Sequence, residues 1–323
     1  MSLDPRILRE ALAEQKDRRH RREEEYRARR RQVYALEPRL EELVRERRGT
    51  VAGMVSAALR SGGDPEAAAE QAKAQAARIR AREEELLTQL GFPPDYLEER
   101  PVCPHCGDTG YVGTRPCQCL LRLYARRQQE ELSRMLDVKG QSFETFDLSL
   151  FDDRADQGGL SDRELMRRVR DYCMDFCRCF GENKESLFLT GQCGTGKTFL
   201  SGCIAREVSA KGFSVCYDTA VRVFSVFEAE RFEHSRQAGE EVHRYLNSDL
   251  MILDDLGTEF TSPFTVSALY TIVNHRLITG RQTIINTNLT LGELPERYSA
   301  QIHSRIAGTY RTLYLRGRDL RLR

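Results

Sequence analysis

The pattern of apolar and polar positions changes character along this 323-residue chain. Residues 1–100 lack β-branched runs and are dense in Arg, Glu, Ala and Gln, a composition that favours helix. Their apolar positions recur at helical spacing, at Val33, Leu36, Leu40, Leu43 and Val44. We predict a charged helical arm over 1–100, in which one helix begins at Pro38 and the next, capped by Asp64-Pro65, runs to Gly91. The two would form an antiparallel hairpin.

Further along, short runs typical of strands alternate with helical stretches. The runs are Leu187–Thr190, Phe213–Tyr217, Leu250–Leu253, Thr283–Ile285 and Thr312–Leu315. Such alternation predicts an α/β fold, a parallel sheet flanked by helices. We therefore expect the helical arm over 1–100, a cysteine module with its following helix over 101–136, a linker over 137–160, and the α/β domain over 161–323.

Charge and composition indicate where in the cell the protein is expected more than they indicate its function. The 50 Lys and Arg balance 49 Asp and Glu to a net charge of +1, so the totals predict no general attraction to nucleic acid or membrane. The sequence has neither a signal-peptide core nor a run near the ~18–20 apolar residues of a membrane span. We expect a cytoplasmic protein without membrane contact, whose clustered cysteines are metal ligands or core residues rather than disulfides.

A phosphate-binding motif follows the first predicted strand of the sheet. It consists of Gly191, Gln192, Cys193, Gly194, Thr195, Gly196, Lys197 and Thr198, and it matches G-x-x-x-x-G-K-[ST]. Its glycines let backbone N–H groups surround phosphate oxygens, Lys197 reaches the β- and γ-phosphates, and Thr198 is a Mg²⁺ ligand. Because a strand precedes the motif and a helix follows it, a chance glycine loop is the weaker interpretation.

Two carboxylates end the strand that lies 57 residues after Lys197. We expect Asp254 to hold Mg²⁺, directly or through water, and Asp255 to orient or deprotonate the attacking water. Many ATPases use Glu where this chain has Asp255, so Glu259 remains an alternative base. The strand ending at Asn286-Thr-Asn288 supplies an amide, for which we choose Asn288, that can contact the γ-phosphate or the lytic water. A simple strand-end turn is the alternative.

The base-reading pattern of GTPases, N-K-x-D, is absent from its expected place, which favours ATP over GTP. Five further segments follow one another in the order typical of one protein family: Leu253–Glu259, Thr287–Leu289, Glu296–Tyr298, Ser304–Ile306 and Gly317–Arg321. On these segments, the run from Phe143 resembles the DnaC/DnaI/IstB group of AAA+ ATPases, and bacterial helicase loaders most closely. The resemblance implies a RecA-like sheet, ATP with Mg²⁺, an arginine finger at Arg305 supplied to a neighbouring subunit, and a second nucleotide sensor at Arg321. Arg305 could alternatively be a surface residue of a helix over 294–307.

Four cysteines stand close together upstream of this domain, at Cys103, Cys106, Cys117 and Cys119. Two close pairs of thiolates with a short hairpin between them predict a structural Zn²⁺ site, with a redox dithiol or unliganded thiols as alternatives. Cys173 and Cys177 share one face of a predicted helix and are interpreted as core residues rather than a second metal site.

The resemblance to loaders with a zinc-binding N-terminal region implies a function. The chain would bind the replicative helicase hexamer through residues 1–136 and use ATP to place it on single-stranded DNA, with self-assembly possible. Two alternatives stay open, an IstB-like transposition helper and a zinc adaptor that nucleotide switches with little hydrolysis.

Overall fold

The computed structural model describes residues 3–61, 65–136, 141–154 and 159–321. Two compact units divide the chain, Met1–Leu12 with Gln118–Arg323 as one and Ala13–Cys117 as the other. Within the described ranges, no helix combines the length and apolar character needed to cross a bilayer. The domain boundaries expected at residues 100, 136 and 160 remain predictions.

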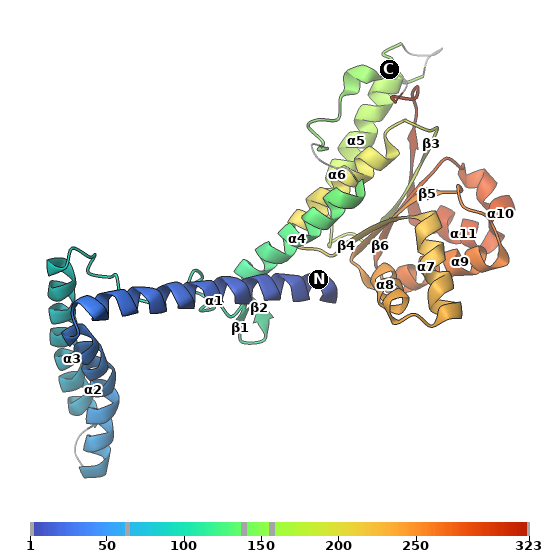
Figure 1. Cartoon of the computed structure of the whole chain (residues 1–323). Helices are drawn as coiled ribbons and strands as arrows, with labels where there is room; N and C mark the ends of the chain where they lie inside the picture. Colours follow the sequence, from blue (N-terminus) through green and yellow to red (C-terminus); the bar gives the residue numbers. More distant parts are fainter. Residues whose placement is uncertain (1–2, 62–64, 137–140, 155–158, 322–323) are drawn as a thin grey trace. The chain divides into compact units, whose positions relative to one another are not determined.

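The unit Ala13–Cys117 is mainly helical. It contains most of α1 (Pro5–Leu36), together with α2 (Arg39–Ser61) and α3 (Pro65–Gln89). The helices α2 and α3 pack along each other, and Val33, Leu40 and Leu87 form a small shared core (Figure 1). Pro38 lies in the turn before α2, and the expected cap Asp64 lies outside the described residues. The unit ends in a two-stranded antiparallel hairpin of β1 (Tyr111–Val112) and β2 (Arg115–Pro116).

A five-stranded parallel sheet forms the centre of the other unit. Its strands are β3 (Ser186–Gly191), β4 (Val215–Thr219), β5 (Leu250–Leu256), β6 (Gln282–Thr287) and β7 (Tyr310–Leu315), in the order β4-β5-β6-β3-β7. All four pairings are parallel, which confirms the expected α/β class. Parallel neighbours require crossover connections, and helices supply them.

Helices cover both faces of this sheet. They are α4 (Gln118–Leu136), α5 (Asp162–Arg178), α6 (Lys197–Ala210), α7 (Ala220–Glu233), α8 (Arg236–Asn247), α9 (Pro263–Ile278), α10 (Leu294–Arg297) and α11 (Ala300–Thr309). Because side chains alternate along a strand, Leu187 and Leu189 of β3 pack in the layer of α5 and α6, while Phe188 packs in the layer of α7, α9 and α11 (Figure 1). Cys173 and Cys177 are buried in the first layer, as expected of core residues.

The single helix expected over 294–307 is two helices. The chain leaves helical geometry at Tyr298, and Ser299 begins α11 by accepting a hydrogen bond from the Ile302 N–H. A serine side chain satisfies an N–H group that a helix start leaves unpaired, so this position favours a new start. The break therefore follows from capping chemistry that the apolar spacing does not reveal.

The first residues of α1 belong to the unit that contains the sheet, and polar contacts hold them there. The Asp4 N–H donates to the hydroxyl of Tyr124 on α4 at 2.9 Å, and Arg6 pairs with Glu131 on the same helix. Arg244 of α8 lies 3.1 Å from Glu131 and 3.7 Å from Asp4. Each of these contacts joins residues more than a hundred positions apart, so the local sequence pattern gives no indication of them.

Candidate functional site

The phosphate-binding loop joins the end of β3 to the start of α6. Gly196 stands at the N-cap of α6 with φ of 98°, and Gly194 has φ of 74°, in the region that favours glycine. A Cβ atom on Gly194 would lie 1.7 Å from Asp319 Oδ1, and one on Gly196 would lie 3.3 Å from the Phe146 ring. The loop therefore has the backbone that the motif predicts, leading directly into a helix N-terminus that favours anions.

Lys197, the lysine of the motif, extends along this loop. Its ammonium group donates to the carbonyl oxygens of Gly191 and Gln192 at 2.7 and 2.8 Å and to Asn288 Oδ1 at 2.7 Å. Burial lowers the pKa of the Lys197 ammonium. The structure thus brings together the lysine and the asparagine that the sequence analysis selected.

The carboxylate of Asp254 lies beside Thr198, as a shared Mg²⁺ site requires. Thr198 Oγ1 is 3.0 Å from Asp254 Oδ2. Asp254 is 2% exposed and also accepts hydrogen bonds from Tyr217 and Asn286. Oxygen ligands of this kind suit Mg²⁺, so Thr198 and Asp254 fit the ion as its protein ligands.

Asp255 differs from its neighbour in exposure and backbone geometry. A register shift between Leu253 and Leu256 interrupts β5, and Asp255 has φ of 54°. At this irregularity the side chain of Asp255 is exposed, whereas that of Asp254 is buried. Burial, and then the Asp254 charge, raise the pKa of Asp255. The alternative base Glu259 is 6% exposed, where it accepts hydrogen bonds from the Tyr298 hydroxyl and the Gly257 N–H.

A cavity of about 630 Å³ lies over the loop, within the usual size range of ligand sites. The predicted residues that line it are Cys193, Gly194, Gly196, Lys197, Thr198, Asp255, Asn288 and Arg321. Leu320 also lines the cavity, and its N–H donates to the Gly194 carbonyl at 3.1 Å. Arg321, predicted from the family resemblance alone, is therefore placed at the nucleotide cavity.

One wall of this cavity was missed by the sequence analysis. It comes from the segment before α5 and consists of Gln141, Thr145, Phe146, Asp147, Leu150 and Phe151. The segment includes a short helix, η1 (Leu148–Leu150), and Phe146 lies against Phe151 and Phe199 with ring centroids 5.7 and 5.5 Å apart. The aromatic-rich run Phe143–Phe151 was the available signal, but we interpreted it as a linker.

Arg305 lies elsewhere in the same chain. It is not among the described residues that line the cavity. Its guanidinium donates to the Tyr270 hydroxyl and to Asn274 Oδ1, both at 2.8 Å, and stacks over the Tyr270 ring at 4.6 Å. The structure thus does not join Arg305 to the nucleotide site of its own chain, and its action on a neighbouring subunit remains a prediction.

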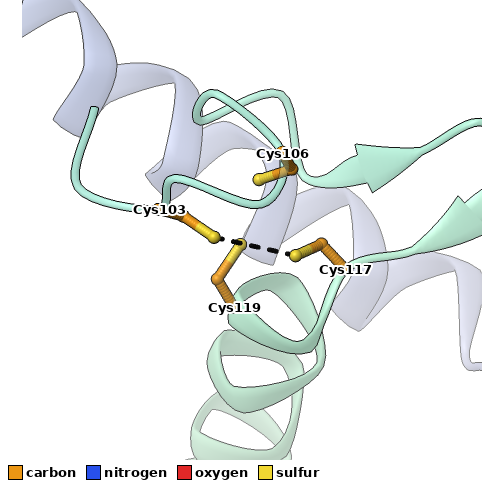
Figure 2. Close-up of side chains that lie close together, drawn as sticks. All are labelled: Cys103, Cys106, Cys117 and Cys119. Atoms are coloured by element: carbon orange, nitrogen blue, oxygen red, sulfur yellow. Dashed lines mark hydrogen bonds between the residues drawn. The ribbon is translucent and has the colours of Figure 1, made fainter. Parts of the chain in front are cut away.

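The four clustered cysteines converge on one point. Figure 2 shows Cys103 and Cys106 on a tight loop, Cys117 after β2 and Cys119 in the first turn of α4, with their sulfur atoms turned toward one another. All four Sγ atoms lie within 4.8 Å of one another, and those of Cys103 and Cys117 are 3.7 Å apart. The carboxylate of Asp108 supports the loop by accepting hydrogen bonds from the N–H groups of Val102 and Cys103.

These thiols fit a zinc ion. All four are among the described residues, and none is in a disulfide. A Zn–S distance of about 2.3 Å in a tetrahedron implies sulfurs about 3.8 Å apart, close to the arrangement seen. Four thiolates leave no open position, so the ion would be structural rather than catalytic.

Comparison with known proteins links this geometry to ATP-binding replication and transposition proteins. The chain is 27% identical to the replicative helicase loader DnaC of Escherichia coli K12 over 142 residues, which are 44% of this chain and 56% of DnaC. It is 24% identical to the replicative helicase loader DnaI of Bacillus subtilis over 234 residues, 64% of this chain and 70% of DnaI. A putative ATP-binding protein in an insertion sequence of Mycobacterium tuberculosis is 27% identical over 104 residues, 32% of this chain and 41% of that protein.

Solved structures give similar matches. A crystal structure of the DnaC helicase loader aligns with a TM-score of 0.47 at 20% identity, over 56% of this chain and 99% of that one. A crystal structure of DnaI aligns with a TM-score of 0.46 at 20% identity, over 58% and 94%. The chain matches little more than half the length of the DnaC loader sequence. The family profile of IstB-like ATP-binding proteins matches residues 124–302, more than half of the chain, and the chain therefore belongs to the IstB-like ATP-binding protein family.

Proposed function

We propose that this protein is an ATP-dependent loader that binds a replicative DNA helicase through its N-terminal region and places it on single-stranded DNA. The observation that carries the proposal is the similarity to two replicative helicase loaders, one of which matches 64% of this chain. The cavity over the P-loop and the cysteine centre upstream of it are consistent with this assignment.

In this proposal the residues around the cavity share the work of ATP hydrolysis. Lys197 and the P-loop N–H groups bind the phosphates, and Thr198 and Asp254 hold Mg²⁺, which neutralises charge on the phosphate oxygens. Asp255 orients or deprotonates the attacking water, and Asn288 contacts the γ-phosphate or that water. Arg321 contacts the nucleotide in its own chain. Arg305 of a neighbouring subunit stabilises the charge that develops during phosphoryl transfer.

In this proposal, the region that contains the cysteine centre binds the helicase. Zn²⁺ bound by Cys103, Cys106, Cys117 and Cys119 keeps a small module folded where the core is limited. The test is co-elution of the full-length chain with its host's hexameric helicase, with and without ATP and single-stranded DNA. We expect Cys106→Ser to weaken helicase association, and Cys179→Ser, at an exposed cysteine outside the cluster, to leave it unchanged.

The co-elution test also isolates the role of ATP. Lys197→Ala should abolish the dependence of complex formation on ATP while the zinc content stays normal. The result would count against the loader function if Cys106→Ser and Lys197→Ala both associated with the helicase as fully as the unmodified chain. It would also do so if the unmodified chain did not associate with the helicase. Single-strand binding should need ATP and weaken with salt, since phosphate contacts release counterions.

A second candidate is an IstB-like helper of transposition. The family profile and the similarity to a protein in an insertion sequence favour it. It predicts ATP-dependent binding to double-stranded DNA and association with a transposase rather than with the helicase. Equilibrium binding to single- and double-stranded DNA of the same sequence separates the two functions.

A nucleotide-switched adaptor with little hydrolysis is the third possibility, because Asp255 is shorter than the Glu of many ATPases. Asp255→Asn keeps the size of the side chain and removes its charge. A hydrolysing loader should then bind ATP and the helicase but stall before release, whereas an adaptor should function unchanged. The amount of helicase transferred to single-stranded DNA in one round distinguishes them.

A further inference from the structure

The phenol of Tyr217 is the candidate for an unassigned role at the nucleotide site. Tyr217 lies on β4, next to β5 in the sheet, and its side chain belongs to the same layer as Ile252 of β5 and Ile284 of β6. Since side chains two positions apart share a face, Asp254 and Asn286 lie on this face too. The sheet therefore places one tyrosine, one carboxylate and one amide side by side on three adjacent strands.

Hydrogen bonds join these three side chains. The Tyr217 hydroxyl donates to Asp254 Oδ2 at 2.5 Å, and Asn286 Nδ2 donates to Asp254 Oδ1 at 2.8 Å. The Asp255 N–H also donates to Oδ1, at 3.0 Å. Asn286 is itself fully buried, and Ser201 of α6 donates to its Oδ1 at 2.8 Å, which fixes the orientation of the amide.

The number of acceptor positions on the Asp254 carboxylate limits what else it can bind. A carboxylate offers about four lone-pair positions, two on each oxygen. On Asp254, Asn286 and the Asp255 N–H take the two on Oδ1, and Tyr217 takes one on Oδ2. Oδ2, which keeps one position, is also the oxygen nearer to Thr198 Oγ1, at 3.0 Å against 3.4 Å for Oδ1.

We propose that Tyr217 is a positioning residue, which fixes the carboxylate of Asp254 so that Oδ2, the oxygen nearer to Thr198, would be available to the Mg²⁺ of bound ATP. This inference rests on the ATP binding in the proposed function. A phenylalanine would fill the same space in the core, so the hydroxyl is explained by its bond to Asp254 rather than by packing. A buried hydroxyl without a partner is costly, and 7% exposure leaves Tyr217 little access to water.

The test measures the Mg²⁺ requirement for nucleotide binding, with a fluorescent N-methylanthraniloyl derivative of ATP and full-length protein. For Tyr217→Phe, we expect the Mg²⁺ concentration at half-maximal binding to rise roughly 10- to 100-fold, the usual effect of removing a group that orients a metal ligand. In EDTA, the variant and the unmodified protein should bind the analogue equally. Asn286→Ala, which removes a donor to the other oxygen, should also raise the Mg²⁺ requirement.

Tyr245→Phe is a matched control. Tyr245 is 1% exposed and donates to Asp218 Oδ2 at 2.8 Å, so it is another buried tyrosine bound to a carboxylate, away from the P-loop. We expect no change in its Mg²⁺ requirement. Comparing binding with and without Mg²⁺ within each protein, below its melting temperature, removes differences in stability from the result.

The other outcomes are equally informative. An unchanged Mg²⁺ requirement in Tyr217→Phe would overturn the positioning role while leaving ATP binding intact. Equal weakening with Mg²⁺ and with EDTA would also overturn it, because the hydroxyl would then act on the loop itself. If the unmodified protein binds no ATP analogue at any Mg²⁺ concentration, the proposed function fails and this inference fails with it.

Discussion

Asn288 Oδ1 accepts a hydrogen bond from the Lys197 ammonium at 2.7 Å, although the two residues are 91 positions apart. The same asparagine lines the nucleotide cavity, and its amide nitrogen lies 3.3 Å from Cys193 Sγ. In the proposed function, this bond places Asn288 next to the phosphate that Lys197 would contact. Its partner along the strand, Asn286, faces the buried Asp254 instead.

This relationship predicts a defect in hydrolysis rather than in binding for Asn288→Ala. Loss of one positioned polar group at the reacting phosphate should lower kcat by about 10²-fold, while ATP affinity changes little. Steady-state phosphate release and binding of an ATP analogue measure the two quantities. If ATP affinity fell in proportion to kcat, Asn288 would be a general binding residue.

The family resemblance predicts that Arg305 acts on a neighbouring chain, and in its own chain Arg305 is bound to Tyr270 and Asn274. Arg305→Ala should then retain ATP binding but lose ATPase activity, and Lys197→Ala should lose ATP binding. Mixing the two variants should restore part of the activity, since each supplies what the other lacks. Phosphate release across mixing ratios is the measurement. If no mixture exceeds the sum of its components, Arg305 does not act between chains.

The cysteine centre predicts one tightly bound zinc ion per chain. Cys106→Ser and Cys117→Ser should each lose the metal, because a structural site with three thiolates is incomplete. Asp108 accepts a hydrogen bond from the Cys103 N–H and pairs with Arg22 of α1. Loss of the metal should therefore reduce the order of helix α1 as well. Elemental analysis measures the zinc content, and far-ultraviolet circular dichroism measures the helix content. A protein that retains full helicity after chelation would show that the module folds without the ion.

The thiols of the ATPase unit should differ sharply in reactivity. Burial raises the pKa of Cys177 and of Cys203 to about 12, and it raises that of Cys173 as well. At about pH 8, only on the order of one in ten thousand of the Cys177 thiols is ionised, because the raised pKa keeps the proton bound.

Cys179 and Cys193 are exposed, so iodoacetamide should label them in the folded protein, whereas Cys173, Cys177 and Cys203 should react only in denaturing urea. ATP should protect Cys193, which lines the cavity, but not Cys179. Peptide mass spectrometry reads each position. Rapid labelling of Cys173 in the folded protein would contradict the packing of α5 described above.

Local patterns predicted the sheet and the residues at its ends. Strand runs such as Leu187–Thr190 are short, apolar and bounded by turn residues, and the motif ending at Lys197-Thr198 has few other structural contexts. The same reasoning selected Asp254 because a buried strand must deliver its terminal polar residues to the sheet edge. These features depend on residues close together in sequence.

Other features depend on distant contacts that no local pattern encodes. Tyr217 looked like one more apolar strand residue, yet its hydroxyl binds Asp254, 37 positions away. Asn286 lies within β6 and donates to Asp254, whereas Asn288 lies just after β6 and accepts from Lys197, and the sequence alone does not show where the strand ends. The first residues were assigned to the charged helical arm, but Asp4 is buried and bound to Tyr124 of α4.

Phe146 lies 174 and 175 positions before Leu320 and Arg321 in the sequence, and all three residues border the P-loop cavity. A ligand in this cavity would therefore contact the segment before α5 and the C-terminal segment of the same unit at the same time. Such a ligand would link two segments that are distant in the sequence, much as a crosslink does, and its binding free energy would stabilise the folded state. Nucleotide should accordingly protect both segments from proteases together, which makes occupancy of the site visible as a cooperative change in digestion pattern.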